Sequence, residues 1–153
     1  MSINSLYRTD ESREVDGVTI NYEDNATGGV LCWFKCRRPG GRNVDFQAAI
    51  NRKLRKHRQE LQGMGDEAQE KLMRKIQAEA YAETVILDWG GDIEGPNGEA
   101  PPECTQENIV WLFTEDCPDL FENLQTRLSF RNTWRPEDKE AAAKNSETAS
   151  GTR

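Results

Sequence analysis

The chain has 153 residues, of which 35% are hydrophobic and 31% are charged, and its formal net charge is −7. This length is enough for one domain with a buried core. No apolar run approaches the roughly 20 residues that a membrane-spanning helix needs, and the first residues lack the basic and apolar regions of a signal peptide. We therefore expect a cytoplasmic protein without a membrane partner.

The first forty residues predict a small antiparallel β-sheet. Short strands are expected at residues 5–9 and 13–15, and Asp16-Gly17 predicts a turn. Val18, Ile20 and Tyr22 then alternate with polar residues, as in a half-buried strand. Residues 30–37 begin with apolar side chains on both faces, so this strand is expected at the centre of the sheet.

Two helices are predicted next, joined by Gly63 and Gly65. Asn43 is the expected N-cap of the first helix, and Asp66 with Gln69 resembles a capping box that begins the second. The apolar stripe of the first helix consists of Phe46, Ala49, Ile50, Leu54, His57 and Leu61. The short connection predicts that the two helices form an antiparallel hairpin.

The end of the second helix is predicted to be the centre of the core. Val85, Ile86, Leu87 and Trp89 make its last turn apolar on every side, which is typical of a buried helix. The following glycines, at positions 90 and 91, are expected to end it. The alternative is a short buried strand at residues 84–87, because β-branched residues favour strands. We favour the helix.

A loop rich in glycine and proline follows, and two closing helices are predicted after it. Thr105 is the expected cap of a short helix, and Asp116 with Pro118 opens a last helix that continues to about Trp134. Residues 137–153 contain no large apolar side chain and predict a disordered polar tail. The expected fold is α+β, with a single domain at residues 1–136 formed by a small N-terminal antiparallel β-sheet followed by about four α-helices.

The sequence has no motif of an enzyme, a cofactor site or a metal centre. His57 is the only histidine and lies on an apolar stripe, so no pair of nucleophile and base can be assigned. Asp88, Asp92 and Glu94 lack the spacing of a calcium-binding loop. Zinc-site spacing is absent among the cysteines, which are Cys32, Cys36, Cys104 and Cys117. We expect a non-enzymatic protein with no cofactor and no bound metal, and with reduced thiols.

The basic residues are concentrated in one segment. Residues 35–58 contain nine Lys or Arg and one acid, whereas the rest of the chain has a charge of −15. Four cations lie off the apolar stripe of the first helix and are candidate partner-binding residues: Arg52, Arg55, Lys56 and Arg58. They are expected to pair with acidic surfaces of the protein itself or of another copy. A nucleic-acid-binding module is the alternative, but the net charge is negative and no known RNA or DNA motif accompanies these residues.

Several short motifs follow one another between residues 6 and 135. They are Leu6-Tyr7-Arg8-Thr9-Asp10, Glu14-Val15-Asp16-Gly17-Val18, Arg38-Pro39-Gly40-Gly41-Arg42-Asn43 before Phe46, Glu83-Thr84-Val85-Ile86-Leu87-Asp88-Trp89, Gly98-Glu99-Ala100-Pro101-Pro102, Glu107-Asn108-Ile109, Asp116-Cys117-Pro118-Asp119-Leu120-Phe121 and Phe130-Arg131-Asn132. In the order of these motifs the chain resembles the tail assembly chaperones of long-tailed bacteriophages.

The resemblance implies a role in building the phage tail. Such chaperones bind the tape measure protein, keep its long apolar helix in solution and help to recruit tail-tube subunits. They act in the host cytoplasm and are not expected in the mature virion. The alternative within phage biology is a structural virion component, such as a head–tail connector or a minor tail protein.

Four aromatic residues of the closing helices are candidates for a partner-binding groove. They are Trp111, Phe113, Phe121 and Trp134. A groove with apolar walls and a charged rim is typical of helix recognition. The alternative, which we favour, is that all four are core residues.

Overall fold

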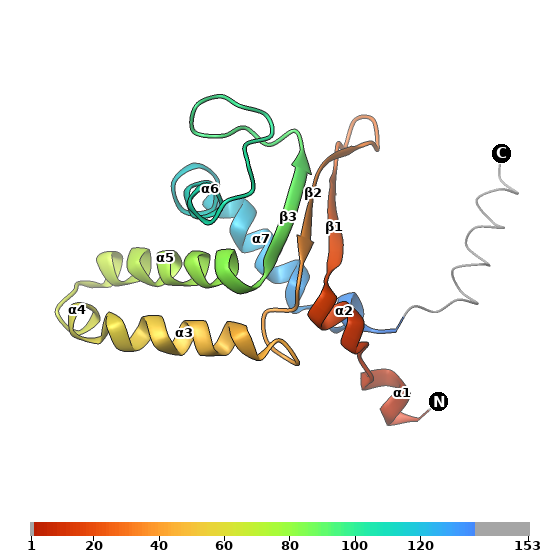
Figure 1. The fold of residues 1–153 in the computed structure, drawn as a ribbon, viewed down its shortest axis with the longest axis horizontal. Helices are drawn as coiled ribbons and strands as arrows, with labels where there is room; N and C mark the ends of the chain where they lie inside the picture. The colour runs from red at the N-terminus through yellow and green to blue at the C-terminus, as the bar shows by residue number, and fades with distance from the viewer. Residues whose placement is uncertain (1, 137–153) are drawn as a thin grey trace, which may run out of the picture.

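The computed structural model describes residues 2–136, and the predicted disordered tail at residues 137–153 lies outside this described part. A three-stranded antiparallel sheet has the order β1-β2-β3, with β1 at Val18–Glu23, β2 at Val30–Cys36 and β3 at Ile86–Gly91. Helices cover one face of this sheet (Figure 1). The predicted α+β class and the central position of the strand at residues 30–37 are confirmed.

The helices of the described part are α1 (Ile3–Tyr7), α2 (Glu11–Asp16), α3 (Val44–Lys56), α4 (Arg58–Gln62), α5 (Asp66–Thr84), α6 (Gln106–Trp111) and α7 (Pro118–Ser129). A π-helical turn, η1 (Leu112–Asp116), joins α6 to α7, and a 3₁₀ turn, η2 (Arg131–Trp134), follows α7. Helices α3 and α5 form the predicted antiparallel hairpin, which extends away from the sheet (Figure 1). Helix α5 also packs against α6 and η1.

The predicted helical turn at residues 85–89 is wrong. Helix α5 ends at Thr84, and β3 pairs with β2 so that Trp89 lies opposite Phe34. Ile86 and Trp89 are both buried, whereas Leu87 and Asp88 between them are exposed. The register shifts between Lys35 and Cys36 of β2, so Leu87 is an extra residue in the pairing and the simple alternation of side chains is interrupted there. Strand β2 offers free backbone groups on this side, and pairing with β3 satisfies them. The strand alternative was therefore the correct one, although the strand begins and ends later than residues 84–87.

Two short strands predicted near the N-terminus are also wrong, because residues 5–9 and 13–15 lie within or beside α1 and α2. Each helix has a side-chain cap: Ser2 accepts from the backbone N–H of Ser5, and Asp10 accepts from the backbone N–H groups of Ser12 and Arg13. Such caps stabilise helix starts by about 1 kcal/mol. The last long helix, α7, ends at Ser129, five residues before the predicted end.

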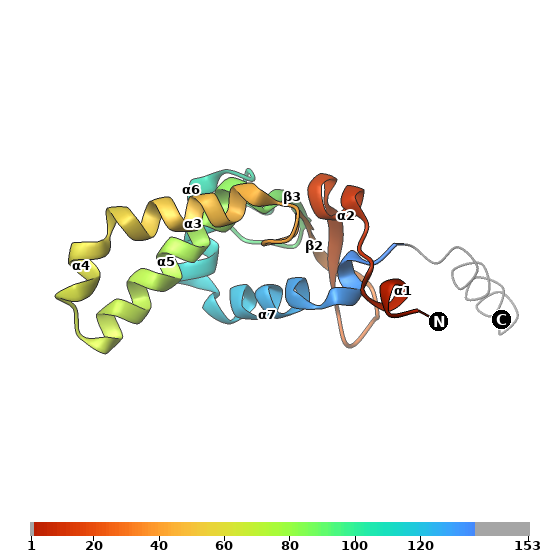
Figure 2. The ribbon, with the colours of Figure 1, turned by 90° about the horizontal axis from the view of Figure 1, so that it is seen from below.

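The core lies between the covered face of the sheet, the second half of α5 and the closing helices. Its centre is a series of aromatic contacts in which Phe34 lies 6.2 Å from Trp89 and 5.9 Å from Phe113, measured between ring centroids. Phe113 stacks on Phe121 at 4.7 Å, and Phe121 meets Tyr81 at 5.0 Å. These contacts fix the closing helices to the sheet and leave the outer half of the α3–α5 hairpin beyond the core (Figure 2).

Candidate partner-binding surfaces

A groove lies between the first half of α5 and the segment formed by α6 and η1. Its volume is about 830 Å³. Four partly buried apolar side chains line it: Met64, Leu72, Val110 and Trp111. We call this site the α5–α6 groove. It is apolar at its centre and open to solvent, which are the properties of a surface that holds another apolar element.

The two walls of the α5–α6 groove carry different charges. The wall formed by α6 and η1 contributes Glu107 and Glu115 and no cation. The α5 wall contributes both signs of charge, namely Lys71, Arg74 and Lys75 together with Glu67 and Glu70. A partner that fills the groove therefore meets an apolar floor between one acidic wall and one wall of mixed charge.

Only one of the four predicted aromatic residues lies in this groove. Trp111 lines it and is half-buried. Phe113, Phe121 and Trp134 have exposed fractions of 0%, 2% and 0% and belong to the core. The 3₁₀ turn after α7 carries Trp134 inward, and its indole N–H donates to the carbonyl oxygen of Leu128 at 2.8 Å. For these three residues the alternative stated for the sequence, that they are core residues, is the correct one.

Part of the basic segment is paired within the protein. Arg52 contacts Glu83 at 2.7 Å, and Lys53 contacts Glu83 at 2.7 Å and Glu79 at 3.3 Å. Burial opposes the charged form of Lys53, but the carboxylates of Glu83 and Glu79 outweigh this effect and raise the pKa of the amine. These contacts join α3 to α5, so Arg52 has a structural role in the hairpin.

The other three predicted cations, Arg55, Lys56 and Arg58, are exposed. Within residues 2–136 none of them contacts a carboxylate in an ion pair. Arg55 and Arg58 border a shallow depression of about 530 Å³ together with the half-buried Leu54 and Leu61. We call this depression the α3–α4 surface.

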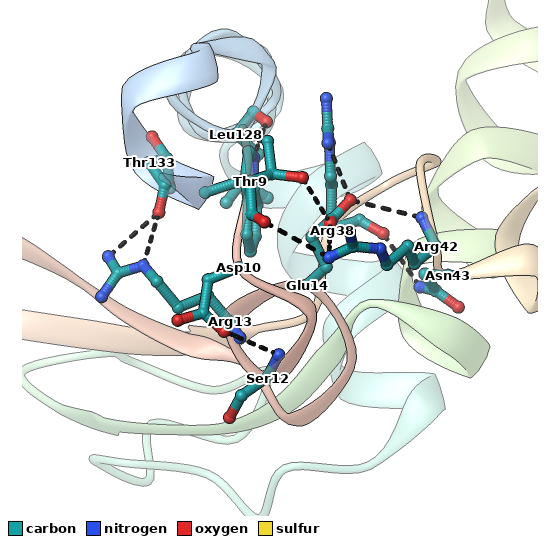
Figure 3. Close-up of polar contacts among 11 residues, drawn as sticks. Thr9, Asp10, Ser12, Arg13, Glu14, Arg38, Arg42, Asn43, Leu128 and Thr133 are labelled. Carbon is teal, nitrogen blue, oxygen red and sulfur yellow. Dashed lines mark hydrogen bonds and ion pairs between the residues drawn. The ribbon is translucent and has the colours of Figure 1, made fainter. Parts of the chain in front are cut away.

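A buried ionic cluster around Glu14 was not predicted from the sequence (Figure 3). The carboxylate is 1% exposed and accepts hydrogen bonds from Thr9 Oγ1 at 2.8 Å and from Arg38 Nη1 at 2.7 Å. Arg42 donates to it from its backbone N–H at 3.3 Å and from Nη1 at 3.1 Å. Burial alone would raise the pKa of Glu14, but these donors lower it below the ordinary value. The cluster attaches α2 to the loop before α3.

Asn43 begins α3 as predicted, but its side chain does not cap the helix. Its amide group instead donates to the carbonyl oxygens of Arg38 and Thr84, both at 2.9 Å. The side chain therefore connects the start of α3 to the end of α5, where the hairpin meets the sheet. No local sequence pattern reports the contact with Thr84, because Thr84 lies 41 residues further along the chain.

The model of one protein family, described as YdaY prophage protein, matches residues 41–145. This match covers about two thirds of the chain. The chain belongs to the YdaY prophage protein family. It is therefore a phage-associated protein, and the α5–α6 groove and the α3–α4 surface both lie inside the matched region. Comparison with curated proteins and with solved structures gives no match.

The cysteines of this family member are free thiols. Burial raises the pKa of each thiol, and that of Cys104 reaches about 11. They are therefore protonated at neutral pH and poor nucleophiles. In the described part of the chain, no group of three or more His, Cys, Asp or Glu is placed to hold a metal ion. Among the same residues, no helix has the length and apolar character needed to cross a membrane.

Proposed function

We propose that this protein is a non-enzymatic chaperone of phage tail assembly. In this role it binds the tape measure protein of the same phage, keeps it soluble and helps to recruit tail-tube subunits. It acts in the host cytoplasm and leaves before the virion matures. The observation that carries the proposal is the α5–α6 groove, whose apolar floor and charged rim fit an amphipathic helix.

The dimensions of the groove suit a short length of helix. The α5 wall runs from Glu67 to Lys75, which corresponds to about 12 Å at a rise of 1.5 Å per residue. A bound helix would contact this wall over about two turns. Its apolar residues at i, i+3, i+4 and i+7 would meet Leu72, Val110 and Trp111, while its polar face remained in water.

A contact of this size is also easy to release. Stable protein interfaces bury about 1,200–2,000 Å² in total, which is more than two helical turns can supply in a shallow groove. One groove would therefore hold its helix weakly, and several copies along a long helix would be needed to cover its apolar stripe. Weak individual contacts are an advantage for a chaperone, because tail-tube subunits must later displace it.

The resemblance to tail assembly chaperones and the membership in a prophage family support the same proposal. The matched residues include every side chain that lines the groove. A nucleic-acid-binding role has less support, because Arg52 and Lys53 are engaged with Glu79 and Glu83.

Co-expression with a tape measure fragment from the same genome tests the proposal. We expect the fragment to move into the soluble fraction and to co-purify with the protein. Trp111→Ala should weaken this capture about tenfold or more, because truncation of a central aromatic anchor typically costs 2 kcal/mol or more. The matched control is Phe130→Ala, which removes an aromatic ring that is 57% exposed and does not line the groove.

Two results would contradict the proposal. In the first, well-folded protein leaves every tape measure fragment insoluble. In the second, the protein is found in purified mature particles at a fixed copy number, which would identify a structural component of the virion. Equal capture by Trp111→Ala and the wild type would show that the helix binds elsewhere on the protein.

A further inference from the structure

We infer that the α3–α4 surface is a second binding site, which takes an acidic amphipathic helix of another protein. The surface is separate from the α5–α6 groove, since the two share no residue. Its residues come only from α3 and α4, whereas the groove is formed by the loop before α5, α5, α6 and η1. The inference goes beyond the proposed function and does not depend on it.

The residues of the α3–α4 surface form one continuous stripe across two helices. They are Asn51, Leu54, Arg55, Arg58, Leu61 and Gln62. Successive spacings of three or four residues place side chains on the same face of a helix. Helix α3 ends at Lys56 and α4 begins at Arg58, so the stripe continues through the junction at His57. The result is an apolar strip bordered by two guanidinium groups.

The charges of this stripe are available to a partner. Arg52 and Lys53, one turn earlier, are paired with carboxylates of α5. Arg55 and Arg58 are exposed and have no such ion pair among the described residues. Exposed arginines on a protein of net charge −7 are complementary to an acidic partner and bind carboxylates through a two-pronged fork.

An acidic helix fits this surface better than a nucleic acid does. Leu54 and Leu61 provide apolar contact, which an amphipathic helix uses and a phosphate backbone does not. No aromatic side chain lines the depression, so bases have no ring on which to stack.

A binding experiment with synthetic probes tests the inference. The first probe is a fluorescent peptide of about 18 residues with Leu at helical spacing and Glu on both flanks of the apolar stripe. The second peptide has Lys in place of every Glu, and the third probe is duplex DNA of about 20 base pairs. Fluorescence anisotropy measures the binding of each probe to the full-length protein at about 50 and 300 mM salt.

We expect the wild type to bind the acidic peptide and to bind it more weakly at the higher salt concentration. The double variant Arg55→Glu/Arg58→Glu should weaken this binding about tenfold or more, because two attractive contacts become repulsive. Leu61→Ala should weaken it as well, which a purely electrostatic attraction would not show. The matched control is Arg8→Glu/Lys35→Glu, which makes the same change of charge at two exposed residues outside both surfaces and should leave the affinity within about twofold.

Three outcomes would overturn the inference. They are the absence of saturable binding of the acidic peptide, equal binding of the lysine peptide, and tighter binding of duplex DNA. None of them bears on the capture of tape measure fragments by the groove. Conversely, Arg55→Glu/Arg58→Glu should still capture those fragments, so the two proposals can fail independently.

Discussion

The buried carboxylate of Glu14 provides a quantitative test of how the N-terminal segment is held. Removal of one partner from a fully buried ion pair costs about 3–5 kcal/mol, because the other charge is left without compensation. Here the side chains of Arg38 and Arg42 are 28% and 48% exposed, so both can regain water. Glu14→Gln keeps the shape and one acceptor oxygen. We therefore expect a smaller loss, of about 2–3 kcal/mol in the free energy of unfolding.

Thermal unfolding followed by circular dichroism at pH 7 measures this loss. In a domain of this size about 1 kcal/mol corresponds to 2–4 °C, so the Tm of Glu14→Gln should fall by about 5–10 °C. The control is Glu11→Gln, since Glu11 is an exposed glutamate of the same helix, α2. Its Tm should lie within about 2 °C of the wild type, as for ordinary surface substitutions.

The difference between the wild type and Glu14→Gln should depend on pH. The pKa of Glu14 is lowered in the folded protein from its ordinary value of 4.5. Folding therefore favours the ionised carboxylate, and its stabilising contribution is complete above pH 4.5 and is lost as the pH falls through the folded-state pKa. Two results would refute this account of the cluster: a difference in the free energy of unfolding between the wild type and Glu14→Gln below about 0.5 kcal/mol at pH 7, or a difference that stays constant down to pH 3.

Three further substitutions test the core and strand β3. Trp89→Ala should lower the free energy of unfolding, measured by chemical denaturation, by about 3–5 kcal/mol. The reason is that the ring is 4% exposed and its N–H donates to the carbonyl oxygen of Pro102 at 2.8 Å. A decrease below about 1 kcal/mol would place this ring outside the core. Gly91→Ala should cost about 2 kcal/mol or more, since Gly91 has a φ of +90° and an added Cβ would collide with the carbonyl oxygen of Leu31. Gly90→Ala should lower the free energy of unfolding less, because the atoms nearest to its added Cβ belong to the movable side chain of Trp33. Equal decreases in stability at the two glycines would contradict the geometry of β3.

Elements with a strong local pattern could be predicted from the sequence. Val18, Ile20 and Tyr22 alternate with polar residues, and this region forms β1. The short connection at Gly63–Gly65 brought two amphipathic segments together as the α3–α5 hairpin. In both cases the side-chain period within the segment was enough to choose the structure.

Strand β3 could not be predicted in the same way, because its structure depends on a partner. The apolar run that ends at Trp89 is compatible with a buried helix and with a buried strand. The choice is made by the free edge of β2, which pairs with residues fifty or more positions later in the sequence. Glu14 is a similar case, since its burial depends on Arg38 and Arg42, which lie 24 and 28 residues away.

The candidate groove was only partly visible in the sequence for a related reason. Aromatic content indicated the closing helices, but it could not separate Trp111 from Phe113, which are two residues apart and face different surroundings. The α5 wall had a detectable signal, since Met64, Ala68 and Leu72 recur at intervals of four. The same interval of four continues to the buried Ile76 and Ala80. The pattern therefore does not separate groove from core, because the sequence does not show that the outer half of the hairpin extends beyond the sheet.

The basic segment shows how internal pairing changes the interpretation of a charged sequence. Five of its nine cations form ion pairs within the described residues, at Arg37, Arg38, Arg42, Arg52 and Lys53. The carboxylates that pair with Arg52 and Lys53 of α3 are Glu79 and Glu83 of α5. Phosphate binding requires many free cations on one face, and the pairing leaves four of the nine cations without an ion pair within residues 2–136. The arginines that remain free border an apolar strip, and this combination favours an acidic protein partner over a nucleic acid.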